Sequence, residues 1–302
     1  SIISLLTGVQ KFTLENLLLG KETQLLIISR IPRLVSILVT GASLGIAGII
    51  VQTISSNKFV SPSTIGTMDW AKFGIMISLI FLGDKSTLLK MTVAFIFALF
   101  GTMLFMKVLS KMKIKNVVMI PLIGIMLGNV VNSITGFVAY KFDLIQNIGS
   151  WMQGNFALVV KGRYELIYIG IPFLVLAYIY TDKFTIVGIG KDFSANLGLN
   201  REKITFIGLI IVSIITASIV VTIGTIPYVG LIIPNIVSIY KGDNMKKSLP
   251  DTAILGALFV LICDIAGRIV MYPYEVSISV IMSIVGSLIF LILIFRRYKY
   301  AN

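Results

Sequence analysis

The sequence predicts an all-α membrane protein, a polytopic bundle of transmembrane helices. Apolar residues make up 57% of the chain and the mean hydropathy is +0.98, well above the values of soluble domains. Uncharged runs recur along the chain, and each can reach into or cross the ~30 Å hydrocarbon layer of a bilayer. These runs cover residues 34–57, 116–140, 166–181, 204–240 and 276–295.

Charge and composition exclude several classes of function. The formal net charge is +13, but the basic residues lie at the ends of apolar runs, where they orient spans and contact lipid headgroups. No segment is long enough to build a folded basic domain, so nucleic acid is not an expected partner. The chain has no histidine, which excludes the common zinc sites and histidine-based triads. Cys263 is the only cysteine, so no disulfide and no metal site are expected.

The apolar runs divide into nine expected spans and an N-terminal stub. Residues 1–9 are too short to span, and we interpret them as the end of a first helix, which brings the count to about ten. Residues 204–240 are too long for one helix, and Pro227 is expected to split them because proline lacks a backbone donor. All of residues 1–302 are assigned to a single transmembrane domain. The expected spans are 34–54, 70–83, 90–107, 116–138, 164–181, 204–223, 227–240, 251–271 and 276–295.

Two local patterns predict how these spans pack. Gly41, Gly45 and Gly48 recur at spacings of four and three, so one face of the first complete span is small and lets another backbone come close. Asp69 and Lys72 are three residues apart at the start of a short span. We expect these two charges to neutralise that end of the span.

The longest polar interruption between two apolar runs is residues 182–204. Its middle, residues 191–199, is expected to form a short helix that Gly198 and Asn200 are suited to end. In a chain built for lipid, this segment would present small and apolar side chains to water. It therefore indicates either a docking surface for a soluble partner or a solvated loop.

The distribution of basic residues predicts a topology. Alternating spans place residues 107–115, 183–203 and 241–247 on one side together with Lys58 and the C-terminal tail. This side carries a modest excess of lysine and arginine, which puts it in the cytoplasm. The guanidinium groups of Arg30, Arg33 and Arg268 then fall on the outer side.

Several segments together resemble the FecCD family of ABC importer permeases, whose members move iron–siderophores, haem and cobalamin. The resemblance runs from about residue 8 to the C-terminus, and its matches occur in order at compatible spacing. The matching segments are Arg30-Ile31-Pro32-Arg33 with the glycine-rich helix after it, Gln52 with Asn57 to Pro62, Trp151 to Gly154, residues 188–200, Gly224 to Pro234, and Asp264 to Arg268.

The resemblance implies the fold of a type II ABC importer permease and a set of partners. The chain would be one multi-pass subunit in the bacterial cytoplasmic membrane, with a second permease subunit, two ATPase subunits and an outer siderophore-binding lipoprotein. It would not be an enzyme and would bind no cofactor, since ATP and magnesium belong to the ATPase. Gly190-Lys191 is not a nucleotide-binding loop, because Asp192 stands where serine or threonine is needed.

The resemblance also implies roles for three arginines. Arg30, Arg33 and Arg268 correspond to residues at the outer mouth that pair with acidic residues of the binding protein. A guanidinium suits this role because it offers two parallel donors to a carboxylate. The alternative for Arg30 and Arg33 is anchoring at the membrane interface. For Arg268 it is a pair with Asp264 within one helix.

Two further sets of residues follow from the resemblance. The segment 183–203 corresponds to the coupling helix that inserts into the ATPase. Polar residues spaced along one face of span 116–138 would line the translocation path, because polar groups at membrane depth are costly unless they face protein or water. Hydrogen bonding between helices is the alternative for this second set. The coupling residues are Gly190, Ala195, Asn196, Leu197 and Gly198, and the path residues are Asn129, Asn132 and Ser133.

Departures from the family pattern point to a substrate class. The form Asn57-Lys58-Phe59-Val60, and Thr67-Met68-Asp69-Trp70 where the family has a small Gly-Ala, look like the subgroup that serves catecholate or petrobactin-type siderophores. For this subgroup we expect a heterodimer of permeases, with a homodimer as the alternative.

Other classes of function stay open at this point. They are a haem or cobalamin importer of the same family and a secondary transporter driven by an ion gradient. The secondary transporter would need ionisable residues in mid-span, of which the spans have almost none.

Overall fold

The computed structural model describes residues 26–83, 85–111 and 119–301. The expected stub at residues 1–9 lies outside them. In chain order the elements are η1 (Leu26–Arg30), α4 (Ile31–Ile54), η2 (Pro62–Ile65), α5 (Thr67–Leu82), α6 (Thr87–Lys111), α7 (Met119–Lys141), α8 (Ile145–Met152), η3 (Phe156–Leu158), η4 (Glu165–Ile169), α9 (Gly170–Ile179), α10 (Thr181–Ile189), α11 (Lys191–Asn196), α12 (Arg201–Ile223), α13 (Val229–Lys241), α14 (Met245–Ile269) and α15 (Ile278–Ala301).

The prediction of an all-α membrane bundle is confirmed. Each of the nine expected spans coincides with helical structure, and the described residues contain no strand. Six helices are long and apolar enough to cross a membrane. The span expected at 164–181 is instead a bent pair, Glu165–Ile179 and Thr181–Ile189, with a 60° change of direction.

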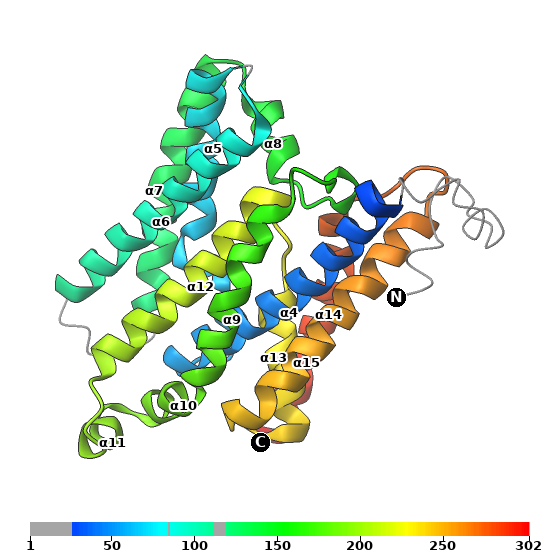
Figure 1. Cartoon of the computed structure of the whole chain (residues 1–302). Coiled ribbons are helices and arrows are strands. Elements are labelled where there is room, and N and C mark those ends of the chain that lie inside the picture. The colour runs from blue at the N-terminus through cyan, green and yellow to red at the C-terminus, as the bar shows by residue number, and fades with distance from the viewer. Residues whose placement is uncertain (1–25, 84, 112–118, 302) are drawn as a thin grey trace.

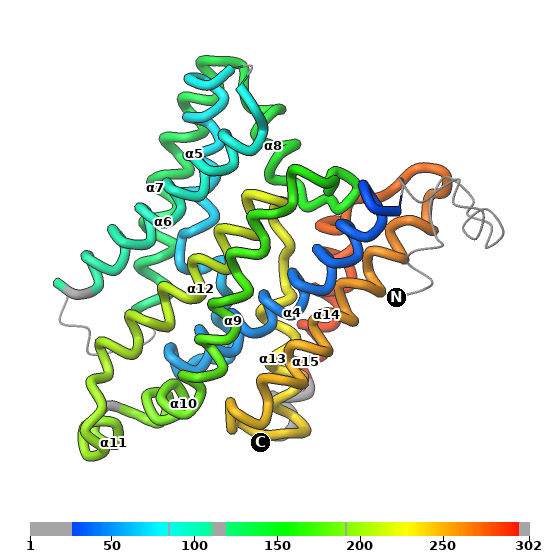
Figure 2. The backbone as a smooth tube through the Cα atoms, viewed as in Figure 1, coloured from blue at the N-terminus to red at the C-terminus, as the bar shows by residue number. Residues whose placement is uncertain are grey.

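Helix α4 lies in the middle of the bundle, between α12 on one side and α14 on the other (Figures 1 and 2). Its predicted small face is confirmed. An ideal Cβ on Gly41 would lie 2.3 Å from the carbonyl oxygen of Gly256 in α14, and one on Gly48 would lie 1.9 Å from that of Gly230 in α13. The two backbones therefore touch α4 directly, which only glycine permits.

The predicted break at Pro227 is also confirmed. Helix α12 ends at Ile223, and α13 begins at Val229. The segment between them pairs with the chain that follows α8: the N–H of Thr225 donates to the carbonyl of Met152 at 2.8 Å, and the N–H of Asn155 donates to that of Ile223 at 3.0 Å. Backbone groups freed by the break are thus satisfied inside the protein, as membrane depth requires.

A second proline, Pro234, lies within α13 and leaves the carbonyl of Gly230 without its usual helical donor. The buried side chain of Gln52 in α4 supplies one. Its Nε2 lies 3.3 Å from the carbonyl oxygen of Gly230 and 3.1 Å from that of Leu231. This amide therefore connects the end of α4 to the interrupted turn of α13.

The bundle has two distinct ends. Helices α10 and α11 and the C-terminus lie at one end, and α8 and the start of α4 lie at the other (Figure 1). Ion pairs between Lys58 and Asp243 and between Lys246 and Asp182 join three segments at the α11 end. Lys58 and the segments 183–203 and 241–247, which the charge distribution grouped on one side, therefore share one end.

Replacing Gly48 with alanine is expected to destabilise the bundle. The new Cβ would collide with the carbonyl of Gly230, and overpacking of this kind costs about 1–3 kcal/mol. Gly136→Ala is the matched control, because nothing lies within 4 Å of a Cβ at that position. Thermal unfolding of both variants in the same detergent measures the effect. A midpoint for Gly48→Ala as high as that of the control would contradict the prediction.

Candidate functional site

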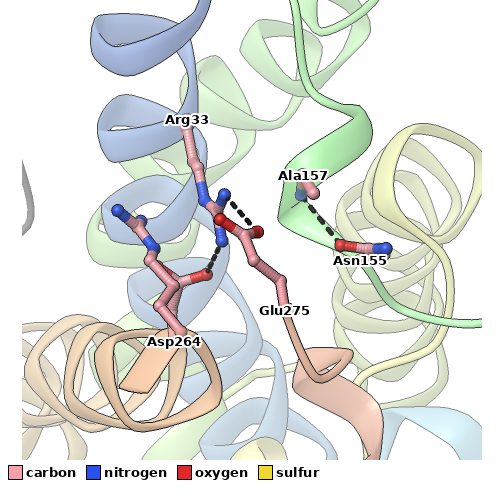
Figure 3. A network of polar contacts seen from close by, with 6 residues as sticks. Arg33, Asn155, Ala157, Asp264 and Glu275 are labelled. Atoms are coloured by element: carbon pink, nitrogen blue, oxygen red, sulfur yellow. Dashed lines mark hydrogen bonds and ion pairs between the residues drawn. The ribbon is translucent and has the colours of Figure 1, made fainter. Parts of the chain in front are cut away.

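Arg33 and Arg268, two of the three arginines predicted for the outer mouth, lie at the end of the bundle opposite α11 and belong to one charge network (Figure 3). Arg33, in the first turn of α4, donates from Nη1 to Oε2 of Glu275 at 2.7 Å and from Nη2 to Oδ1 of Asp264 at 2.9 Å. Arg268 pairs with the other oxygen of Asp264, one turn away in α14. The network joins α4, α14 and the connection between α14 and α15.

Burial changes what these arginines can do. Asp264 and Arg268 are buried, and the side chain of Arg33 is 13% exposed. The predicted pair of Arg268 with Asp264 is confirmed. Two carboxylates thus already balance Arg33 and Arg268. Arg30 is half-buried at the end of η1. A binding protein would meet the partly exposed edge at Arg33 and Glu275, and docking by Arg30, Arg33 and Arg268 stays a prediction.

Glu275 is a member of this network that the sequence reasoning missed. It follows the turn Tyr272-Pro273-Tyr274 between two spans, and a carboxylate at such a turn is an ordinary surface feature. Its contact with Arg33 depends on residues 242 positions apart. The sequence did contain a clue to Glu275, however. Two arginines and one aspartate near the same end leave one positive charge, which a further carboxylate would balance.

The predicted path residues lie near the middle of α7. Asn129 and Ser133 are exposed, and the Ser133 hydroxyl donates to the carbonyl of Asn129 at 2.9 Å. Asn132 is half-buried and turns towards α5. The structure therefore separates the three: two lie on an open face and one lies at its margin.

Asp69 and Lys72, the two charges expected to neutralise the start of this span, both turn towards α7. Among the residues that the structure describes, Lys72 makes no ion pair with Asp69, and its Nζ donates to Oδ1 of Asn132 at 2.7 Å. The carboxylate of Asp69 packs over α7, where an ideal Cβ on Gly128 would lie 2.3 Å from Oδ2. Both side chains reach across to α7, because α5 and α7 run side by side in the same direction.

The predicted coupling segment folds as α10 and α11. Gly198 adopts the left-handed conformation, with φ of 71°. The N–H of Leu199 donates to the carbonyl of Ser194 at 2.9 Å, and that of Gly198 donates to Ala195 at 2.9 Å. This is the Schellman end of a helix, so the prediction for Gly198 is confirmed. Asn200 instead caps the next helix, by accepting from the N–H of Lys203.

The tip of this segment is apolar and open. Leu197 is 54% exposed, and Phe193, Ala195 and Asn196 are exposed beside it. The base is fixed, since the Ser56 hydroxyl donates to the carbonyl of Gly188 at 3.0 Å. A cavity of about 600 Å³ lies between the base of the segment and the ends of α4 and α13. An apolar tip on a fixed base is suited to contact with another protein.

Comparisons with known proteins decide the family. The profile described as the FecCD transport family matches residues 1–296. The chain belongs to the FecCD transport family. It is 55% identical over 303 residues to the petrobactin import system permease YclN of Bacillus subtilis, covering 100% of this chain and 96% of that protein.

A second relative agrees with this family, and a solved structure matches the fold. The chain is 38% identical over 274 residues to the ferric-anguibactin transport system permease FatD of Vibrio anguillarum, covering 91% of this chain and 87% of FatD. The fold matches a solved inward-facing ABC transporter of metal-chelate type with a TM-score of 0.84 at 22% identity, over 97% of this chain and 95% of that one.

The family's motifs lie at contacts between helices in this member. Trp151 to Gly154 pairs with the break after α12, where the indole N–H of Trp151 donates to the carbonyl of Val221 at 3.2 Å. Gln52 supports α13, and Asp264 to Arg268 builds the outer network. The segments of this chain that match the FecCD pattern therefore mark contacts between its helices as well as the surfaces predicted to meet partners.

Arg33→Gln is expected to destabilise the protein, because it leaves two carboxylates short of a counter-charge. Removing one partner of a buried pair costs roughly 3–5 kcal/mol. The lower end of this range applies here because Arg33 is 13% exposed. The control is Lys246→Gln, whose pair with Asp182 is exposed and of a type that contributes about 0–1 kcal/mol. Thermal unfolding that shows equal losses in both variants would refute this ranking.

Proposed function

We propose that this chain is a membrane permease subunit of an ATP-binding-cassette importer that moves an iron–siderophore of petrobactin or catecholate type. The observation that carries the proposal is the family, together with the roles of two relatives, YclN and FatD, which are permeases for petrobactin and ferric-anguibactin. Both are named for iron chelates, which favours this substrate class over haem and cobalamin.

The proposed cycle begins outside. A binding protein brings the chelate to the end that carries the Arg33 network, and its acidic residues exchange with Glu275 for the exposed edge of that arginine. Binding of ATP and magnesium by two separate ATPase subunits then moves the apolar tip of α11. The chain itself makes and breaks no covalent bond; it couples two conformational equilibria.

Helix α4 is the element that can carry this motion. Its inner end packs on α10, where an ideal Cβ on Gly188 would lie 2.8 Å from Thr53. Its outer end carries Arg33. Between these points its backbone touches α13 and α14, so a displacement of α10 has to shift all three helices together.

The remaining partners follow from the surfaces that the bundle leaves apolar. Helices α7 and α15 expose large side chains such as Phe137 and Phe295, which lipid and a second permease subunit would cover. A related but different chain is favoured as this second subunit, with a homodimer as the alternative. The α11 end and the C-terminus would face the cytoplasm.

The first test is to tag the chain in its native membrane, purify it gently and identify what accompanies it. We expect an ATPase, a second permease and a binding protein, with ATP hydrolysis that rises when the binding protein carries ferric petrobactin. A chain that purifies alone and hydrolyses nothing would overturn the proposal.

Leu197→Asp is expected to abolish co-purification of the ATPase, because a carboxylate would replace the apolar tip that the ATPase buries. Leu158→Asp is the matched control. Leu158 is 59% exposed and Leu197 54% exposed, but Leu158 lies in η3, away from the α11 end. Loss of the ATPase from both variants, or from neither, would remove α11 from the coupling role.

A further inference from the structure

Lys72 places its ammonium group where a charge is costly. It reaches Asn132 near the middle of α7, a helix long and apolar enough to cross the membrane. Ionisable side chains at this depth are rare and in most cases functional. An ammonium has three donors, and within the described residues Lys72 uses Nζ for the single hydrogen bond to Asn132. Capacity for further acceptors remains.

On one side, Lys72 lies close to an exposed face of α7. Asn132 lies between the buried face of α7 and the exposed face that carries Asn129. The Asn129 side chain makes no hydrogen bond within the part of the chain that the structure describes, although an unpaired amide in lipid is unfavourable. Asn129 and Ser133 form a narrow polar strip on this face, beside large apolar side chains such as Met126 and Phe137 that are also exposed. Lys72 lies at its edge.

Asp69 and Lys72 interact electrostatically but contact different residues of α7. The carboxylate of Asp69 lies over Gly128 on the buried side of α7, whereas the ammonium of Lys72 lies beside Asn132 at the exposed margin. The positive end of the pair is therefore the end nearer the open face. A ligand on that face would meet the ammonium before the carboxylate.

We propose that Lys72, with Asn129 and Asn132, binds the anionic oxygens of the ferric chelate as it crosses the bundle. This inference rests on the proposed function and adds a residue that selects for charge. The oxygens of a catecholate chelate carry more negative charge than one ferric ion neutralises. An ammonium donates strong, charge-assisted hydrogen bonds to such oxygens, and a chelate without net negative charge gains little from it.

The test uses the whole importer, with its ATPase and binding protein, in proteoliposomes supplied with radioactive ferric petrobactin. The quantity measured is iron delivered per ATP hydrolysed. Lys72→Gln is expected to lower it about tenfold or more, the effect of losing one charge-assisted hydrogen bond. Stimulation of hydrolysis by the loaded binding protein should stay unchanged, because docking and coupling lie at the two ends. A purely structural defect would lower both quantities.

Three further variants make the outcome decisive. Lys72→Arg should restore most of the iron delivered per ATP, and Lys141→Gln, at the exposed end of α7, should match the wild type. Asn129→Asp adds a negative charge on the exposed face and should lower the iron delivered per ATP. This variant keeps the test usable if the Lys72→Gln protein does not accumulate in the membrane. Unchanged delivery in Asn129→Asp and Lys72→Gln, or no rescue by arginine, would overturn the inference. A wild-type importer that delivers no ferric petrobactin would overturn the proposed function itself.

Discussion

At its glycines, α4 meets α13 and α14 backbone against backbone, and the rest of the bundle depends on this close approach. The carbonyl of Gly230 occupies the space where a Cβ of Gly48 would be, and the carbonyl of Gly256 does the same at Gly41. In lipid no hydrophobic force drives helices together, so close packing and hydrogen bonds hold them. These contacts hold α4 against both neighbours along its length.

Several polar groups inside the bundle are satisfied by partners from other helices. Gln52 supplies the donor that Pro234 denies to Gly230, and Trp151 donates to a carbonyl of α12. Asp264 balances arginines from two helices. Unsatisfied groups at this depth cost several kcal/mol each.

Patterns within one segment were readable from the sequence, whereas contacts between segments were not. Apolar runs predicted the helices, the spacing of Gly41, Gly45 and Gly48 predicted a close approach, and Gly198 predicted a helix end, because each depends on local geometry. The partners of Lys72 and Arg33 lie 60 and 242 positions away in the sequence. Spacing along the chain therefore drew attention to Asp69 as the charge nearest to Lys72 and gave no sign that Glu275 contacts Arg33. The bend before α10 was missed because no proline or glycine marks Tyr180.

Under the proposed function, the chemistry of the chain changes with position in a way that suits three different partners. At the Arg33 end, the charges are balanced within the chain. Glu275 pairs with Arg33, so an acidic residue of a docking protein can replace Glu275 without leaving the arginine unpaired at any stage. In the middle, a lysine paired with a neutral amide keeps its charge for a passing anion. At the α11 end the tip is apolar, so its contact is insensitive to ionic strength and transmits displacement by packing. In this scheme, electrostatic contacts serve the two brief encounters, with the docking protein and with the passing anion. The apolar contact at α11 serves the partner that has to stay bound through each cycle.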